Sequence, residues 1–272
     1  MQGLGAWTPP GGTLGEIVAE AAQRAEALHS RTAELAAQAR DASPPPAFAP
    51  ALRGNHVAVI AEVKRKSPSK GWINPGLSAG EQAAAYASGG AAAVSVLTEP
   101  AHFGGSTDDL RAVRERVSLP ALKKDFHVDP VQLLEAKAAG ASAALLIVRA
   151  LSHDALQRMT DAAAGLELEC LVEVRDAEEL DRALAVGAEA IGVNSRNLET
   201  LTIDSAAAER LIRLIPNGIV AVAESAVSSR EDVERLGRAG ANAVLVGSAV
   251  SAASDPATAV RRLAGVARSG RG

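Results

Sequence analysis

The sequence predicts a (β/α)8 barrel that carries a helical extension at its N-terminus. Eight short runs rich in Val, Ile, Leu and Ala recur about every 26 residues, and stretches with helical periodicity lie between them. These runs are apolar almost throughout, as expected of parallel strands buried on both faces. Four predicted helices end in a Gly-Ala pair directly before the next run, where glycine suits the left-handed residue that closes a helix. Eight such units are typical of a closed barrel.

The N-terminal extension is predicted from its own pattern. Apolar residues at three- and four-residue spacing predict a helix over 13–40, with Thr13 and Glu16 as a capping box. Prolines 44–46 end it, because proline lacks the backbone N–H that the helix requires. The predicted organisation is a single domain, with residues 1–50 as an extension packed on the barrel and residues 51–272 as the barrel itself.

The eight expected strands follow in order. They are predicted at residues 57–63, 92–97, 120–123, 143–148, 169–174, 189–193, 219–223 and 242–246. A doubly wound open sheet is the alternative fold. It would carry a G-x-G-x-x-G turn after its first strand, and the sequence has none there.

Composition excludes several classes of function. The chain has 272 residues, 47 % of them hydrophobic and 22 % charged, which is a globular balance. Its formal net charge of −4 argues against nucleic acid or an anionic membrane as a partner, because both require a basic face. The single cysteine, Cys170, allows no intrachain disulfide. No apolar run reaches the roughly 18 residues that span a bilayer, and the first 12 residues lack a signal-peptide pattern, so a cytoplasmic protein is expected.

In this architecture, chemistry is expected where the strands end and their loops begin. Six of the predicted strands end in polar residues or glycine. These residues are Glu62 and Lys64, Lys124, Glu173, Asn194 and Arg196, Glu224 and Ser225, and Gly247 and Ser248.

Each of these has a structural alternative. Glu62 and Lys64 could be an ion pair that only stabilises the fold, whereas Glu173 has no cation next to it in the sequence, which favours a functional role. The basic loop 64–70 could be a solvated face. A nucleic-acid patch is disfavoured there because the loop has no aromatic residue to stack on bases.

The last two strand ends predict an anion site. Backbone N–H groups at Gly247 and Ser248 lead into a short helix, and barrels often bind phosphate between their last two loops. A phosphorylated small molecule is therefore the expected substrate. The five histidines show no metal-ligand spacing and no cofactor motif is present, so acid–base chemistry without metal or cofactor is expected.

At these residues the sequence resembles the indole-3-glycerol phosphate synthase family of tryptophan biosynthesis. The resemblance covers nearly the whole chain. It rests on IAEVKRKSPSK (60–70), LTEP (97–100), FGGS (103–106), KKDF (123–126), LLIV (145–148), LVEV (171–174), IGVNSRNLETL (191–201) and AES (223–225).

The resemblance implies a lyase that closes the indole ring of a carboxyphenylamino-deoxyribulose 5-phosphate with loss of CO2 and water, using no cofactor or metal. Lys124 resembles the general acid that protonates the substrate ketone. Glu173 and Lys64 resemble groups that move protons, with their division of roles left open. Glu62 is similar to the partner of Lys64, and Asn194 and Ser225 to polar contacts of the reacting centre.

The remaining positions carried over are substrate-binding ones. Ser67, the backbone at Ser225 and Ala226, and Gly247 and Ser248 would hold the phosphate. Arg196 and Glu224 resemble supporting polar residues. The aromatic ring would lie against Pro68, Phe103, Phe126, Leu145, Leu198 and Leu201. Apolar walls and neighbouring cations are expected to lower the pKa of Lys124.

The sequence departs from the family pattern at a few positions. Ala226 stands where the family usually has glycine, and alanine would strain the site if the backbone there has positive φ.

The alternative functions are a phosphoribosylanthranilate isomerase and a phosphosugar-binding barrel without catalysis. The isomerase is disfavoured because the end of the first strand lacks a cysteine. A monomer is expected, with a weak dimer as the alternative.

Overall fold

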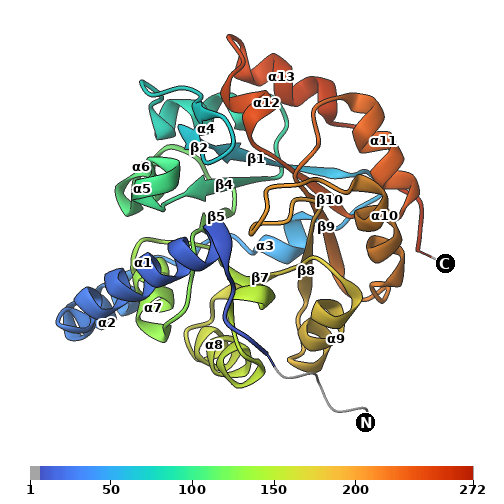
Figure 1. The fold of residues 1–272 in the computed structure, drawn as a ribbon. Coiled ribbons are helices and arrows are strands. Elements are labelled where there is room, and N and C mark those ends of the chain that lie inside the picture. Colours follow the sequence, from blue (N-terminus) through green and yellow to red (C-terminus); the bar gives the residue numbers. More distant parts are fainter. Residues whose placement is uncertain (1–6, 272) are drawn as a thin grey trace.

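The computed structural model describes residues 7–271 and confirms the predicted barrel (Figure 1). Eight parallel strands close in the order β1-β10-β9-β8-β7-β6-β5-β4, so each strand pairs with its neighbours in the chain and the first pairs with the last. The strands are β1 (Ala58–Val63), β4 (Ala93–Leu97), β5 (Ala121–Lys124), β6 (Ala143–Ile147), β7 (Glu169–Val174), β8 (Ala190–Asn194), β9 (Val220–Glu224) and β10 (Ala243–Val246). Each lies within a residue or two of its predicted position.

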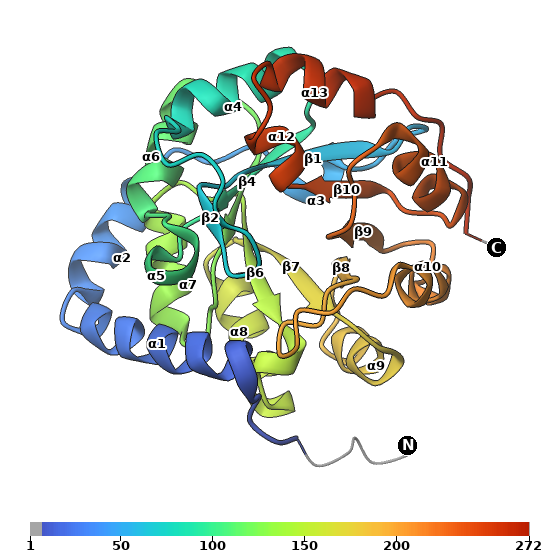
Figure 2. The same cartoon turned by 45° about the horizontal axis from the view of Figure 1, so that its top comes forward.

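A ring of helices surrounds the strands, as Figure 2 shows. They are α4 (Ala79–Ser88), α6 (Thr107–Arg116), α7 (Pro130–Ala138), α8 (His153–Gly165), α9 (Ala177–Ala185), α10 (Ser205–Leu214), α11 (Arg230–Arg238) and α13 (Pro256–Leu263). Side chains at the residue before the helix accept backbone N–H groups in seven of these eight, from Ser106 to Asp255. Gly90, Gly140, Gly187 and Gly240 all have positive φ, as the Gly-Ala pairs predicted.

The N-terminal helix prediction was partly wrong. The structure has two helices, α1 (Gly12–His29) and α2 (Thr32–Asp41), separated at Ser30 and Arg31. Helical spacing of apolar residues continues across this break, so periodicity alone could not find it. The predicted capping box is also absent: α1 begins after Gly11, whose N–H donates to Glu199 Oε1 at 2.9 Å. Residues 1–6 and 272, which belong to the predicted extension and barrel, lie outside the described residues.

Short elements complete the fold. The hairpin of β2 (Lys66–Ser67) and β3 (Gly71–Trp72) lies in the loop after β1, and α5 (Pro100–Phe103), the 3-10 turn η1 (Val148–Ala150) and α12 (Ser248–Ser251) follow other strands. Helix α3 (Phe48–Ala51) lies at the N-terminal end of the strands, where the N–H groups of Phe48 and Ala49 donate to Glu169. Among the described residues no helix has the length and apolar character that a membrane crossing needs.

Two apolar layers make the core. The first lies between strands and helices and contains mostly Val, Leu, Ile and Ala. The second fills the barrel interior, where Phe48 and Ile60 pack with Leu122, Leu145 and Leu171. Leu14 and Ile17 of α1 join this interior layer. Helix α1 is therefore packed on the end of the barrel at which the strands finish, whereas Phe48 of α3 fills the interior from the other end.

One buried carboxyl makes stability depend on pH. Glu179 of α9 is 6 % exposed, and burial, reinforced by Asp176, raises its pKa to about 7 although the Arg175 N–H opposes this. The unfolded chain releases this proton near pH 4.5 and the folded chain near pH 7, so stability falls as the pH rises between these values.

We therefore expect Glu179→Gln to stabilise the protein more at pH 8 than at pH 5, by up to about 3 kcal/mol. The amide oxygen can still accept the Arg175 N–H that Glu179 accepts at 2.7 Å. Urea unfolding at the two pH values measures the difference, and exposed Glu178→Gln is the matched control. An equal effect of Glu179→Gln at both pH values would contradict the prediction.

Candidate active site

A cavity of about 500 Å³ opens at the C-terminal ends of the strands. Except for Glu173, every residue predicted for the site lines it. They are Glu62, Lys64, Ser67, Pro68, Phe103, Lys124, Phe126, Leu145, Asn194, Arg196, Leu198, Leu201, Glu224, Ser225, Ala226, Gly247 and Ser248. Glu173 lies just behind this wall and contacts the cavity residues Lys124 and Asn194.

Lys124 lies at the centre of the charged groups. Its Nζ is 3.1 Å from Glu173 Oε2 and 3.2 Å from Glu224 Oε2, and 13 % of its side chain is exposed. Burial lowers the pKa of Lys124, but Glu173, Glu224 and Glu62 together outweigh burial and raise it. The expected lowering of this pKa was wrong, because the barrel surrounds the lysine with carboxylates rather than cations. The ammonium is therefore charged at neutral pH and can act as a proton donor.

Glu224, unlike Lys124, is shifted toward its uncharged form. Burial raises its pKa to about 8, although Lys124 opposes this, and Glu173 adds to the rise. Within residues 7–271, its Oε1 has no hydrogen-bond partner. Gly192 lies against this oxygen, and a Cβ there would collide with it. Glu224 therefore keeps a proton to a higher pH than an ordinary carboxyl group does, while its Oε2 lies 3.2 Å from the ammonium of Lys124.

Glu62 and Lys64 form a second charged pair on the cavity wall. Lys64 Nζ is 3.4 Å from Glu62 Oε1, and Ser95 Oγ donates to Glu62 Oε2 at 3.1 Å. The absence of a side chain at Gly247 leaves room for this pair, because a Cβ there would lie 2.5 Å from Glu62 Oε1 and would displace it. The two residues are thus paired with each other and also line the cavity, a geometry compatible with both the structural and the functional interpretation.

A hydrogen-bonded chain links Glu173 to the loop after β9. Asn194 Nδ2 donates to Glu173 Oε1 at 3.1 Å, and Ser225 Oγ donates to Asn194 Oδ1 at 2.8 Å. The Arg196 N–H donates to the same Oδ1 at 3.0 Å, while its guanidinium donates to the Leu201 carbonyl. This chain orients the carboxylate of Glu173 toward Lys124.

One wall of the cavity is apolar. The rings of Phe103 and Phe126 lie 6.2 Å apart between centroids, and Lys64 Nζ is 5.6 Å from the Phe103 centroid. Leu14 and Ile17 of α1 face the same space, with Leu145, Leu198 and Leu201. An aromatic ring can bind between these side chains while its polar substituents reach the lysines.

The residues predicted to hold a phosphate also line the cavity. They are Ser67, Ser225, Ala226, Gly247 and Ser248. Ser225 and Ala226 have φ values of +63° and +53°, so the alanine does occupy the left-handed region that favours glycine. The strain expected from the sequence is present in the backbone.

Ala226→Gly should therefore tighten binding of inorganic phosphate at least twofold, because removing Cβ lets the anion approach the backbone. The relief of strain, about 1 kcal/mol, is largely offset by the entropy that glycine loses on folding, so the Tm should change little. Calorimetric titration with phosphate measures the effect. The matched control is Ala252→Gly, an exposed residue with φ of −86°, and equal phosphate affinity in wild type and Ala226→Gly would contradict the prediction.

Sequence reasoning missed several residues of the site. Leu14 and Ile17 carry only a helical-spacing signal, which does not say which surface they cover. Ser95 supports Glu62, and the Ser251 Oγ accepts the Lys64 N–H at 3.1 Å. A serine within the apolar run 92–97 was a usable signal for Ser95, whereas nothing in the local sequence marked Ser251.

The matching family model and the two sequence relatives described here carry the same name. The family model described as indole-3-glycerol phosphate synthase matches residues 14–263. The indole-3-glycerol phosphate synthase of a Nocardioides species is 52 % identical over 234 residues, which is 86 % of this chain and 90 % of that protein. Indole-3-glycerol phosphate synthase 1 of Streptomyces coelicolor is 48 % identical over 230 residues, covering 85 % and 86 %.

Solved structures support the fold alone. The 3-hexulose-6-phosphate synthase from Salmonella typhimurium matches with a TM-score of 0.60 at 14 % identity, over 76 % of this chain and 96 % of that one. Thiamine phosphate pyrophosphorylase from Pyrococcus furiosus matches with a TM-score of 0.56 at 17 % identity, over 76 % and 93 %. At these identities the shared feature is the barrel.

Proposed function

The chain belongs to the indole-3-glycerol phosphate synthase family, and from this premise we propose how its side chains divide the work of the reaction. The enzyme is a carboxy-lyase of tryptophan biosynthesis. It converts 1-(2-carboxyphenylamino)-1-deoxyribulose 5-phosphate to indole-3-glycerol phosphate, with release of CO2 and water.

Lys124 is the general acid for ring closure. The observation that supports this most is the position of its Nζ between Glu173 and Glu224, which keeps the ammonium charged on the cavity surface. As the ring carbon that bears the carboxylate attacks the ketone carbon, the ketone oxygen gains electron density and accepts the proton of Lys124. The bond to CO2 then breaks, and its electron pair restores the aromatic ring.

Dehydration requires two further proton transfers. The new hydroxyl leaves as water after it receives a proton, and a base removes a proton from the neighbouring carbon. Glu173 and Lys64 are the groups proposed for these transfers. Glu173 is hydrogen-bonded to Lys124 and can exchange a proton with it. Lys64 also lines the cavity, with Glu62 as its partner. Asn194 and Ser225 hold Glu173 in place.

Substrate binding follows from the residues that line the cavity. The aromatic ring is proposed to lie against Phe103, Phe126 and the leucines, and the phosphate at Ser67, Ala226, Gly247 and Ser248. Pro68, Arg196 and Glu224 complete the proposed contacts.

We further propose that residues 1–50 are an extension that forms part of the cavity wall, and that residues 51–272 form the barrel. A cytoplasmic monomer, or at most a weak dimer, is also proposed, without nucleic acid or membrane partners, which the net charge of −4 supports.

The test is the appearance of indole fluorescence when purified protein is mixed with the carboxyphenylamino-deoxyribulose phosphate. We expect a rise in signal that saturates with substrate. A folded protein that binds the substrate, as measured by calorimetry, but produces no fluorescence would favour the phosphosugar-binding alternative.

A further inference from the structure

The guanidinium of Arg24, on helix α1, contacts two acidic residues that lie next to residues of the candidate site. Arg24 Nη2 donates to Asp125 Oδ1 at 2.8 Å, and its Nη1 lies 3.4 Å from Glu99 Oε1. Both carboxylates are buried, with Asp125 6 % and Glu99 0 % exposed, while 29 % of the arginine side chain is exposed. Arg24 therefore bridges two buried acids that come from different βα loops.

Asp125 fixes the backbone on which Lys124 sits. Its carboxylate accepts the Phe126 N–H at 2.8 Å and the Thr98 hydroxyl at 2.6 Å. The Thr98 N–H in turn donates to the Lys124 carbonyl at 3.1 Å. Although burial opposes it, the charges of Lys123, His127 and Arg24 lower the pKa of Asp125 to about 2. Asp125 is thus an ionised side chain that fixes the backbone between Lys124, the proposed general acid, and Phe126 of the aromatic wall.

Glu99 fixes the other ring. Its oxygens accept the N–H groups of Ala101, His102 and Phe103, which begin helix α5. Phe103 ends this short helix and faces Phe126. Because Arg24 binds Glu99 and Asp125 together, it constrains the distance between the two loops that carry Phe103 and Phe126.

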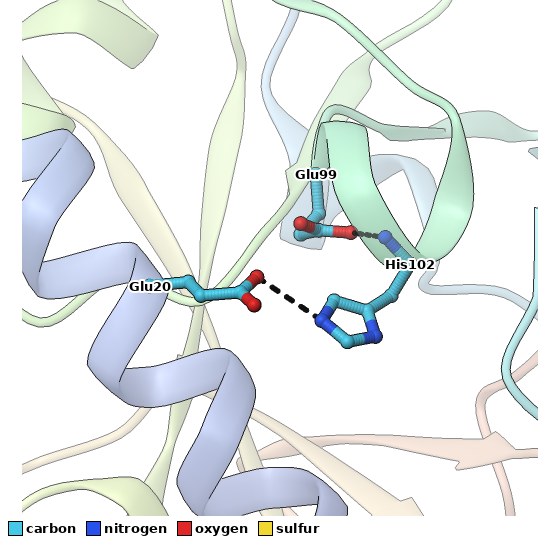
Figure 3. A group of neighbouring side chains, drawn as sticks. All are labelled: Glu20, Glu99 and His102. Carbon is cyan, nitrogen blue, oxygen red and sulfur yellow. Dashed lines mark hydrogen bonds and ion pairs between the residues drawn. The ribbon is translucent and has the colours of Figure 1, made fainter.

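A neighbouring group on α1 offers a built-in comparison. Figure 3 shows Glu20 of α1 pointing toward the His102 ring, with its Oε2 3.1 Å from Nε2, beside Glu99. Ligand atoms of Glu20, Glu99 and His102 lie within 4.8 Å of one another, but both Glu99 oxygens already accept backbone N–H groups. We therefore interpret this cluster as a tether between α1 and α5. It joins the same two helices as Arg24 does but makes no contact with Asp125.

We propose that Arg24 is a positioning residue for the reaction, acting through Asp125 and Glu99 on Lys124 and on the Phe103–Phe126 pair. This inference rests on the proposed roles of Lys124 and of the aromatic wall. Misplacing a reacting group by about 1 Å can cost on the order of a hundredfold in rate. Loss of Arg24 therefore lowers the rate at which bound substrate reacts (kcat) and also the affinity for the substrate. A helix that only covers the cavity would change affinity alone.

The experiment compares Arg24→Gln, Arg24→Lys and Glu20→Gln in the full chain, with kcat and KM measured separately by indole fluorescence. We expect Arg24→Gln to lower kcat/KM about tenfold, with kcat itself falling at least threefold. Arg24→Lys keeps a charge but cannot bridge both acids, so it should restore part of kcat. Glu20→Gln, which loosens the same helix, should change kcat by less than twofold.

Two results would overturn the inference. One is an unchanged kcat in Arg24→Gln with only a lower Tm or a higher KM, which would make Arg24 a structural tether. The other is an equal kcat loss in Glu20→Gln. If Arg24→Gln does not fold, Arg24→Lys with unchanged kcat serves as the contradicting result. Failure of the proposed role of Lys124 is distinguishable, since Lys124→Ala would then retain activity whatever Arg24 does.

Discussion

Lys124→Ala should lower kcat at least a hundredfold while the protein still binds its substrate. A positioned general acid contributes roughly 10²–10⁴-fold to rate, and the substitution removes the only group that contacts both Glu173 and Glu224 in the described hydrogen bonds and ion pairs. KM should change less, because the aromatic wall and the residues proposed to hold the phosphate do not depend on this side chain. Indole fluorescence under saturating substrate measures kcat, and calorimetry measures binding.

The control for Lys124→Ala is Lys137→Ala, which removes a lysine of α7 outside the cavity. Circular dichroism shows whether both variants are folded. Lys124→Ala takes the cation away from two buried carboxyl groups. Asn194 still donates to Glu173, and burial already favours the uncharged form of Glu224, so the fold is expected to survive. A kcat loss below tenfold in a folded Lys124→Ala variant would rule out Lys124 as the general acid.

Glu173→Gln is expected to have the second-largest effect, a loss of at least a hundredfold in kcat. Glutamine fits the same space and can still accept the Asn194 amide, which donates to Glu173 at 3.1 Å. It cannot accept a proton from Lys124 or return one. The lost function is thus proton transfer rather than packing, and KM should stay within a few-fold of the wild-type value.

Glu224→Gln is the matched comparison for Glu173→Gln, because both glutamates contact Lys124 at nearly the same distance. The pKa of Glu224 is raised to about 8, so this side chain holds a proton to a higher pH than an ordinary carboxyl group, and glutamine resembles the protonated form. We expect a kcat loss of tenfold or less. Equal losses in the two variants would mean that Glu173 acts only by holding Lys124 charged.

Most of the barrel could be predicted because its signals are local. The apolar run at 143–148 and the glycine before it are read from neighbouring residues, and they give β6 and the turn before it almost to the residue. The break between α1 and α2 at Ser30 has no such signal, since Leu28 and Leu35 continue the helical spacing. The hairpin with Lys66 and Trp72 was missed because each of its strands has only two residues.

The sequence predicted which residues line the site, but not which of their side chains contact one another. Parallel strands end at one edge of a barrel, so Glu62, Lys124 and Glu173 could be assigned to one face from the strand ends alone. Their partners could not be assigned. The direction of the Lys124 pKa was predicted wrongly because the carboxylates around it lie on β7, β9 and β1 rather than beside it in the sequence.

The sequence by itself therefore determined the barrel, the family, and the strand ends and residue types of the proposed site. These follow from periodicity, caps and motifs, each of which is set within a few consecutive residues. Only the tertiary structure decided which groups touch. Lys124 meets Glu173 across 49 residues of chain and Arg24 meets Asp125 across 101. The charge of Lys124, the strained backbone at Ala226 and the bridge from α1 all depend on such distances, which exist only once the barrel has closed.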